Sequence, residues 1–112
     1  MKLITAIVGA GKLDDMTRAV VDAGARGMTV TEVRGFGQQY GHAPGTSPAE
    51  RATVLLPKLR VDIVVRDQDA AVVVDAIAGS AKTSVIGDGK IWVCPVDGAW
   101  RVRTGERDDD AV

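Results

Sequence analysis

The sequence predicts an α/β protein of the α+β type, with the split βαβ or ferredoxin-like arrangement of one antiparallel four-stranded sheet and two helices on one of its faces. Two observations lead to this prediction. The segments read strand, helix, strand and then strand, helix, strand along the chain. In the clearest strand pattern, at residues 59–66, the apolar set Leu59, Val61, Ile63 and Val65 alternates with Arg60, Asp62, Val64 and Arg66.

The first strand–helix–strand unit spans residues 3–34. Residues 3–8 form a short run rich in β-branched residues, which favours a strand. Asp14 and Asp15 suit the first turn of a helix, and Gly24 and Gly27 indicate where that helix ends. Its inner face is predicted from apolar residues at helical spacing, namely Leu13, Met16, Val20 and Ala23. Residues 28–34 have the β-branched content of a second strand.

The second unit begins with the strand at 59–66 and continues with a helix predicted over residues 67–81. Asp67 is a candidate cap for this helix, and its inner face is predicted to be Ala70, Val73, Val74 and Ile77. A turn at 87–89 precedes a fourth strand at 91–96. Residues 99–103 are compatible with a short extra strand, and residues 108–110 are expected to be a solvated tail.

Length and charge limit the possible functions. The 112 residues suit a single domain over 1–112, and a net charge of -1 gives no basis for nucleic-acid binding through bulk electrostatics. Cys94 is the single cysteine, so a disulfide within the chain is impossible and a reducing compartment is favoured. No apolar run approaches the ~20 residues of a membrane span. We therefore expect a cytoplasmic protein without direct membrane insertion.

The sheet is expected to expose apolar residues on the face without helices. Val64, for example, lies opposite the buried face of its strand. Because an uncovered apolar sheet face needs a partner, we predict a homo-oligomer.

A long connection at residues 35–58 separates the two units and shows no sustained period of 2 or 3.6. Loops beyond ~12–15 residues are uncommon in compact domains and are functional or disordered. Cations near turns suggest a phosphate site: Lys58 closes this loop, and Lys90 follows Gly87-Asp88-Gly89. Arg101 and Arg103 would point the same way on an extended segment. The alternative is a hairpin-type turn beside ordinary surface arginines.

The chain resembles the PII signal-transduction family. The motifs that carry the resemblance are Met28-Thr-Val-Thr-Glu-Val33, Gly35-Phe-Gly37, Gly41-His42, Leu56-Pro-Lys58, Ile86-Gly-Asp-Gly-Lys90 and Arg101-Val-Arg-Thr-Gly-Glu106. The resemblance implies a ferredoxin-like homotrimer with nucleotide sites between subunits. It also implies a T-loop at about 37–57, a B-loop at about 82–90 and a C-loop at about 96–112.

The family's ligand positions can be transferred to matching residues. The resemblance implies that ATP or ADP is bound by Thr29, Gly37, Gln39, Lys58, Asp62, Val64, Thr83, Gly87, Asp88, Gly89, Lys90, Arg101 and Arg103. Gln39, Lys58 and the backbone of Gly41 would serve Mg-ATP and 2-oxoglutarate, with Gln39 near the metal. The bound ligand would set the shape of the T-loop, which would act on a transporter, such as an ammonium channel, or on a metabolic enzyme.

Several positions depart from the family pattern. Arg51 and Ala49 stand where members carry a modifiable tyrosine or serine, so neither modification can occur there. The segment Gly9-Ala10-Gly11 replaces Lys-Pro-Phe, and Asp62 replaces a glutamate. An alternative is therefore a PII-like adenine-nucleotide sensor for another small metabolite, such as bicarbonate, that controls a transporter or enzyme outside nitrogen metabolism.

Other function classes have weaker support from the sequence. An enzyme is not expected, because His42, Cys94 and Glu50 suggest no nucleophile–base pair by their spacing. An RNA-binding module of this fold would need stacking aromatics on its central strands, and residues 3–8 and 59–66 contain none.

Overall fold

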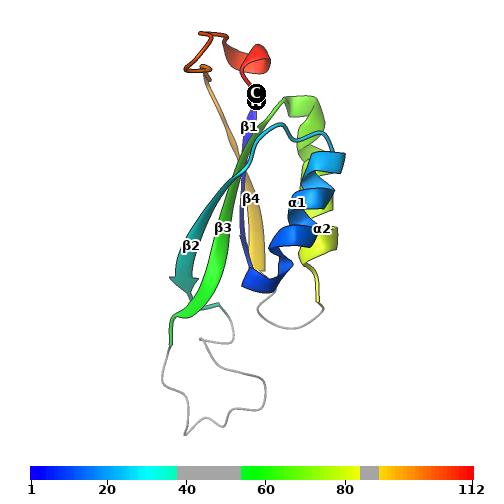
Figure 1. Ribbon diagram of the computed structural model, residues 1–112, viewed down its shortest axis with the longest axis vertical. Coiled ribbons are helices and arrows are strands. Elements are labelled where there is room, and N and C mark those ends of the chain that lie inside the picture. The colour runs from blue at the N-terminus through cyan, green and yellow to red at the C-terminus, as the bar shows by residue number, and fades with distance from the viewer. Residues whose placement is uncertain (38–53, 84–88) are drawn as a thin grey trace, which may run out of the picture.

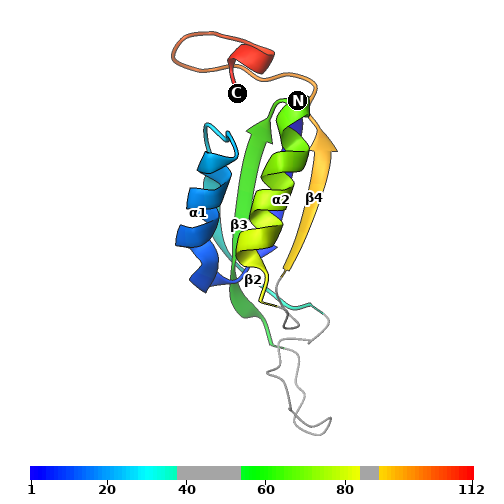
Figure 2. The ribbon, with the colours of Figure 1, turned by 90° about the vertical axis from the view of Figure 1, so that its right-hand side faces the viewer.

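The structure, a computed structural model, describes residues 1–37, 54–83 and 89–112. Its sheet has the order β2-β3-β1-β4, and every neighbouring pair is antiparallel. The strands are β1 (Lys2–Val8), β2 (Thr29–Gly35), β3 (Leu56–Val65) and β4 (Gly89–Pro95). Two helices, α1 (Leu13–Asp22) and α2 (Ala70–Ala81), lie side by side over one face of the sheet (Figures 1 and 2). The predicted ferredoxin-like fold is confirmed.

The core lies between the sheet and the two helices, and side-chain alternation in the central strands creates it. On β1, Ile4, Ala6 and Val8 are buried toward the helices. On β3, the predicted apolar face is buried as expected, and its members pack with residues of both helices in one cluster. The helix residues in that cluster are Met16, Val20, Val73, Ile77 and Ala81. Each fully buried Val, Ile or Met contributes about 1.5–3 kcal/mol relative to an exposed side chain.

Gly24 ends α1 as predicted and turns the chain toward β2. Its φ of +103° is in the left-handed region, where glycine has no Cβ penalty. The amide of Ala25 donates to the carbonyl of Val20, and the amide of Gly24 donates to Val21, each at 3.0 Å. This pair of bonds is a Schellman motif, which satisfies carbonyls that the helix end would otherwise leave free. Gly27 lies beyond the helix, just before β2.

The predicted cap of α2 is wrong. A 3-10 turn, Asp67–Asp69, precedes the helix, and no side chain caps either element. The Asp67 carboxylate instead lies 2.8 Å from the α-amino group of Met1. The hydrogen bond from this amino group and its positive charge lower the pKa of Asp67. The reason is spatial: β1 begins beside the end of β3, so a full positive charge competes with the helix amides for the carboxylate.

The extra strand proposed for residues 99–103 is also wrong. Trp100 forms one isolated antiparallel bridge with Arg107, and a turn occupies residues 102–104. Gly105, with φ +74°, donates its amide to the Arg101 carbonyl at 2.8 Å. The chain therefore reverses before a strand can extend. The following residues, Asp108–Asp110, are exposed as predicted but form a 3-10 turn.

The face of the sheet without helices carries apolar residues on several strands. Strand pairing places Trp92 beside Thr5, and Leu3 beside both Val64 and Cys94. Val64 is 37% exposed and Trp92 is 38% exposed. The prediction that Val64 lies opposite the buried face is confirmed. No helix within the described ranges has the length and apolar character to cross a bilayer.

Gly89, the first residue of β4, cannot be replaced without a conflict with β1. Its φ is +113°, and a Cβ atom there would collide with the carbonyl oxygen of Ile7. We expect Gly89→Ala to lower the free energy of unfolding by at least about 2 kcal/mol, measured by urea denaturation. Gly79→Ala is the control, because a Cβ at Gly79 in α2 meets open space and should stabilise by about 0.5–1 kcal/mol. Equal unfolding midpoints for the two variants would contradict this account.

Candidate functional site

A pocket of about 420 Å³ lies where the end of β3 and the start of β2 meet the C-terminal segment. In Figure 2 this segment passes over the end of the sheet at which both termini lie. The pocket is lined by Arg26, Gly27, Met28, Thr29, Asp62, Val64, Arg101, Ala111 and Val112. Four of these residues, from three separate parts of the chain, were predicted as nucleotide contacts: Thr29, Asp62, Val64 and Arg101.

Antiparallel pairing places three of these side chains together. Thr29 on β2 lies directly opposite Asp62 on β3. Val64 follows Asp62 by two residues, so its side chain projects from the same face of the sheet. That face is the one without helices, and the pocket therefore opens on the uncovered side.

The Asp62 carboxylate is held by its neighbours in the sheet. The hydroxyl of Thr5, which is fully buried, donates to Asp62 Oδ1 at 2.8 Å. Arg60 Nε donates to Oδ2 at 3.1 Å, and Arg60 Nη2 donates to Oδ1 at 3.4 Å. Burial acts to raise the pKa of Asp62, but the hydrogen bonds from Arg60 and Thr5 and the charge of Arg60 outweigh it and lower the pKa. Asp62 is therefore an ionised acceptor with a fixed orientation.

Arg101 reaches the pocket from a loop that is closed by its own hydrogen bonds. The Arg101 amide donates to the Glu106 carbonyl at 2.8 Å, and Arg101 Nε lies 3.5 Å from Glu106 Oε1. Thr104 Oγ1 donates to the same carboxylate oxygen at 2.7 Å. Arg103 lies inside the turn and is exposed, so the prediction that Arg101 and Arg103 share one extended segment is wrong.

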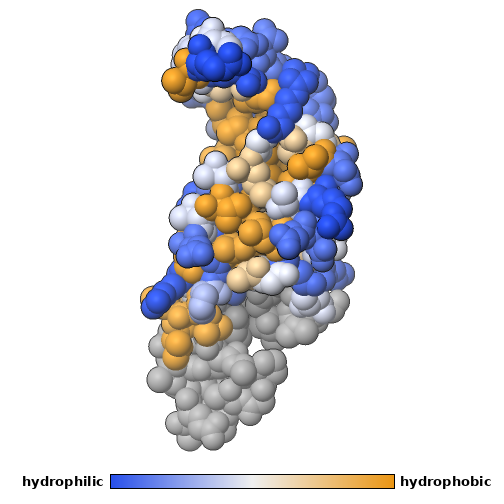
Figure 3. Space-filling model, in the orientation of Figure 1, coloured by the Kyte–Doolittle hydropathy of each residue, from blue (hydrophilic) through white to orange (hydrophobic). Residues whose placement is uncertain are grey.

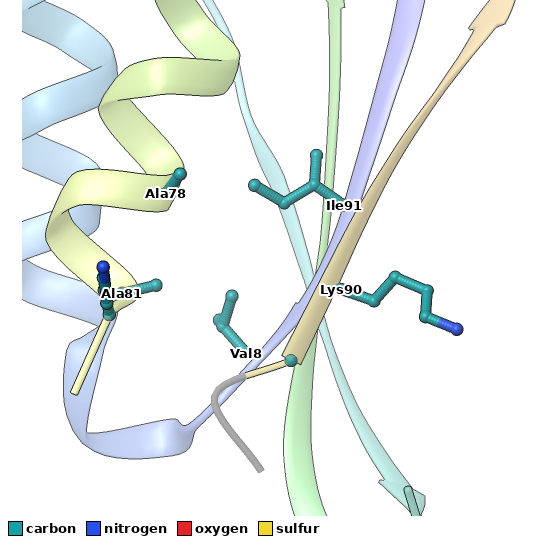
Figure 4. A pocket seen from close by; sticks show the side chains of 7 residues that line it. Val8, Ala78, Ala81, Lys90 and Ile91 are labelled. Atoms are coloured by element: carbon teal, nitrogen blue, oxygen red, sulfur yellow. The ribbon is translucent and has the colours of Figure 1, made fainter. Parts of the chain in front are cut away.

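A second pocket, of about 320 Å³, lies at the start of β4 on the helix side of the sheet. Figure 4 shows Val8, Ile91, Ala78 and Ala81 around it, while the side chain of Lys90 points away. Strand pairing places Lys90 beside Ile7, which pairs in turn with Arg60. The Lys90 ammonium therefore belongs to the uncovered face, like the side chains of Asp62 and Val64.

The structure keeps the remaining predicted residues away from the first pocket or does not describe them. Lys58 lies on β3 opposite Val33, Thr83 follows α2, and Gly37 follows β2. Gln39, Gly41, Ala49, Arg51, Gly87 and Asp88 lie outside the described residues.

The two groups of predicted ligand residues lie at opposite edges of the sheet. Thr29 is on the edge strand β2, whereas Gly89 and Lys90 are on the edge strand β4. Three strand spacings separate these edges, which corresponds to about 14 Å. Within one chain, the residues at the start of β4 therefore contribute nothing to the lining of the pocket beside Thr29.

A groove of about 520 Å³, lined by both charged and apolar residues, lies between α1 and the edge strand β2. Its apolar lining comes from Leu13, Val21, Met28 and Val30, and Val21 is 60% exposed. Figure 3 shows apolar surface over this part of the molecule, between the sheet and α1. The groove contains none of the predicted ligand residues.

Several residues that line or support the pocket were not predicted from the sequence. Ala111 and Val112 follow no periodic pattern, so nothing in the sequence indicated that they return to the sheet. Thr5 and Arg60 support Asp62 across the sheet, and such support becomes visible only when the strand register is known. Gly27 and Met28 could have been found from their position directly before Thr29.

Comparison with known proteins settles the family. A family model described as nitrogen regulatory protein P-II matches residues 1–106. The chain belongs to the P-II family. Proteins described as nitrogen regulatory protein P-II from Pasteurella multocida, Synechocystis and Klebsiella oxytoca are similar over the full length of both chains, with 47%, 46% and 48% identity over 112 residues.

Membership confirms the resemblance that the motifs indicated. P-II proteins are signal-transduction regulators in nitrogen regulation and are not enzymes, so the prediction of a non-enzymatic regulator is confirmed at this level. The chain matches these relatives from its first residue to its last.

The hydrogen bonds around Asp62 predict an acid-dependent loss of stability. Because the folded-state pKa lies below the ordinary value of 3.8, the contribution is fully present above that value. It is lost as the pH falls through the folded-state pKa. In urea unfolding measured from pH 6 to pH 3, the wild type should exceed Asp62→Asn in stability, and the difference should shrink below about pH 4.

Asp75→Asn, on the exposed surface of α2, is the matched control and should follow the wild type. A stability difference between the wild type and Asp62→Asn that stays constant over this pH range would contradict the role given to Asp62.

Proposed function

We propose that this P-II protein binds ATP or ADP between the subunits of a homotrimer and controls a transporter or enzyme of nitrogen metabolism through the loop at 37–57. The observation that carries the proposal is the convergence of Thr29, Asp62, Val64 and Arg101 on one pocket. The resemblance to the P-II family implies a nucleotide contact at each of these four positions.

The chemistry of the pocket suits the nucleoside end of such a ligand. Its volume of about 420 Å³ lies within the roughly 300–1,000 Å³ typical of small-molecule sites. Asp62 offers an ionised acceptor and Thr29 a hydroxyl, while Met28 and Val64 offer apolar contact to a flat base. Arg101 supplies one cation for phosphate.

A triphosphate needs more positive charge than this pocket holds, and we assign that charge to a second copy of the chain. Two of the candidate phosphate residues, Gly89 and Lys90, lie on the edge strand β4, opposite the edge that carries Thr29. The other two, Gly87 and Asp88, directly precede them in the sequence. A neighbouring copy that presents its β4 edge to the β2 edge of the first would complete the site, with Arg103 and Thr83 at its margin. Trp92 and Val64 are partly exposed on the uncovered face of the single chain. Association of the copies would bury this apolar surface, which favours the same assembly.

The effector part of the proposal concerns the loop. Gln39, Gly41 and Lys58 would bind 2-oxoglutarate with Mg-ATP, since a 2-oxo acid can chelate the metal while a lysine receives its distal carboxylate. The bound ligand would set the loop conformation that a partner such as an ammonium channel recognises in the cytoplasm. With Ala49 and Arg51 at the positions modified in other members, ligand binding alone would control the loop.

Titration calorimetry with ATP, ADP and AMP, each with and without Mg and 2-oxoglutarate, tests the proposal. We expect ATP and ADP to bind and 2-oxoglutarate to bind in the presence of Mg-ATP. Failure of every adenine nucleotide to bind would overturn the proposal. Binding of nucleotides without 2-oxoglutarate, with a response to bicarbonate instead, would favour the alternative of a PII-like sensor for another metabolite.

A subunit-mixing experiment tests the division of the site between copies. Lys90→Ala and Arg101→Gln should each weaken ATP binding about tenfold or more without loss of the trimer, because each removes one phosphate contact. Arg18→Gln, on the outer face of α1, is the control and should bind as the wild type does.

When the two weak variants are unfolded together and refolded, random mixing should restore tight binding at about a quarter of the interfaces. No restoration in verified mixed trimers would show that both residues act within one chain, and would contradict the shared site.

A further inference from the structure

The C-terminal segment forms a closed loop that leaves the sheet and returns to it. It starts where the Val96 amide donates to the Met1 carbonyl at 3.1 Å, directly after β4. The amide of Asp108 then donates to the Ala99 carbonyl at 2.8 Å, across the base of the loop. Figure 2 shows this segment as an arm that swings out over the end of the sheet and comes back, so that the C-terminus lies near the end of β3.

A side chain of the main body holds the returning end of this arm. Arg66, the residue after β3, donates from Nε to the backbone carbonyl of Asp109 at 3.2 Å. The turn that contains Asp109 is closed by the Ala111 amide, which donates to the Asp108 carbonyl at 2.8 Å. Together these bonds fix the direction in which Ala111 and Val112 leave the turn.

That direction carries Ala111 and Val112 into the pocket beside Thr29, Asp62 and Val64. Both residues are half-buried, in contrast to the exposed residues 101–110 that precede them. Val112 also lies in a small cleft with Arg26 and Arg66, so it packs against the end of β3 from two sides.

We infer that Ala111 and Val112 form an apolar wall of the nucleoside pocket, that they set its preference among bases, and that Arg66 is the positioning residue that holds this wall in place. The inference rests on the proposed nucleotide function. The ligand class is a purine nucleotide, whose flat base buries apolar surface against Val64 on one side and this wall on the other. The phosphates lie at the Arg101 end and do not contact the wall.

A substitution in the wall should change how tightly the base is bound and leave the phosphate contacts unchanged. Val112→Asp replaces the apolar side chain with a carboxylate beside the base, and we expect ATP affinity to fall about tenfold, equivalent to 1.4 kcal/mol. The preference for ATP over GTP should decrease, whereas the ratio of ATP to ADP affinity should stay at its wild-type value. Val72→Asp, at an exposed valine of α2, is the matched control and should change neither quantity.

Arg66→Gln tests the positioning role of Arg66. It also provides an independent test of the wall if the Val112→Asp variant does not fold. We expect ATP affinity to fall about threefold to fivefold, with a weaker preference over GTP. Arg66→Lys should restore part of the affinity, because an ammonium can still donate to the Asp109 carbonyl. Arg18→Gln on α1 removes the same charge elsewhere and should behave as the wild type does.

The measurements are calorimetric titrations of the full-length protein with ATP, ADP and GTP, together with the thermal midpoint without nucleotide. One outcome overturns this inference while the proposed function stands: the wild type binds ATP, and both Val112→Asp and Arg66→Gln keep the wild-type affinity and the wild-type ratio of ATP to GTP affinity. If they lose affinity for all three nucleotides in equal proportion, the wall does not contact the base and the inference is also overturned. A wild type that binds no nucleotide overturns the proposed function itself.

Discussion

The antiparallel pairing of β1 with β3 is the constraint on which both surfaces of this protein depend. It fixes Thr5 opposite Asp62 and Ile4 opposite Ile63, one pair on each side of the sheet. A shift by one residue would place the core set in solvent and remove the carboxylate from the pocket. The Thr5–Asp62 hydrogen bond of 2.8 Å contributes to this specificity, because a slipped register would leave a buried hydroxyl without its acceptor.

The elements that the sequence predicted well are those in which periodicity and burial agree. The alternation at 59–65 predicts side chains on one face of a strand, and the spacing of Met16 and Val20 predicts side chains on one face of a helix. Both sets are buried in the same core. Their boundaries were less accurate: β3 begins at Leu56, three residues before its alternating pattern. Pairing with β2 extends the strand there, since Leu56 lies opposite Gly35. Such an extension depends on the partner strand and leaves no signal in the local sequence.

The errors occur where a contact distant in the chain overrides a local preference. Asp67 has the residue type of a helix cap, yet the amino group of Met1 takes its carboxylate. Residues 99–103 have strand-like composition, yet the reversal at Gly105 and the stacking of Arg107 over Trp100 at 5.1 Å form a closed loop. The family motifs identified Thr29, Asp62, Val64 and Arg101 individually. Their common pocket, and the residues Thr5 and Arg60 that hold Asp62, could be known only from the fold.

The position of β1 in the middle of the sheet also affects how the chain reaches its native state. β1 is synthesised before both of its partners, which are β3, about 50 residues later, and β4, which ends at Pro95. One edge of β1 therefore stays unpaired until β4 has left the ribosome. Sheets dominated by such distant pairings fold slowly, because loop-closure entropy is lost before the pairing becomes favourable. During synthesis, the apolar residues of β1 that the fold later buries are exposed, and such transient exposure favours aggregation.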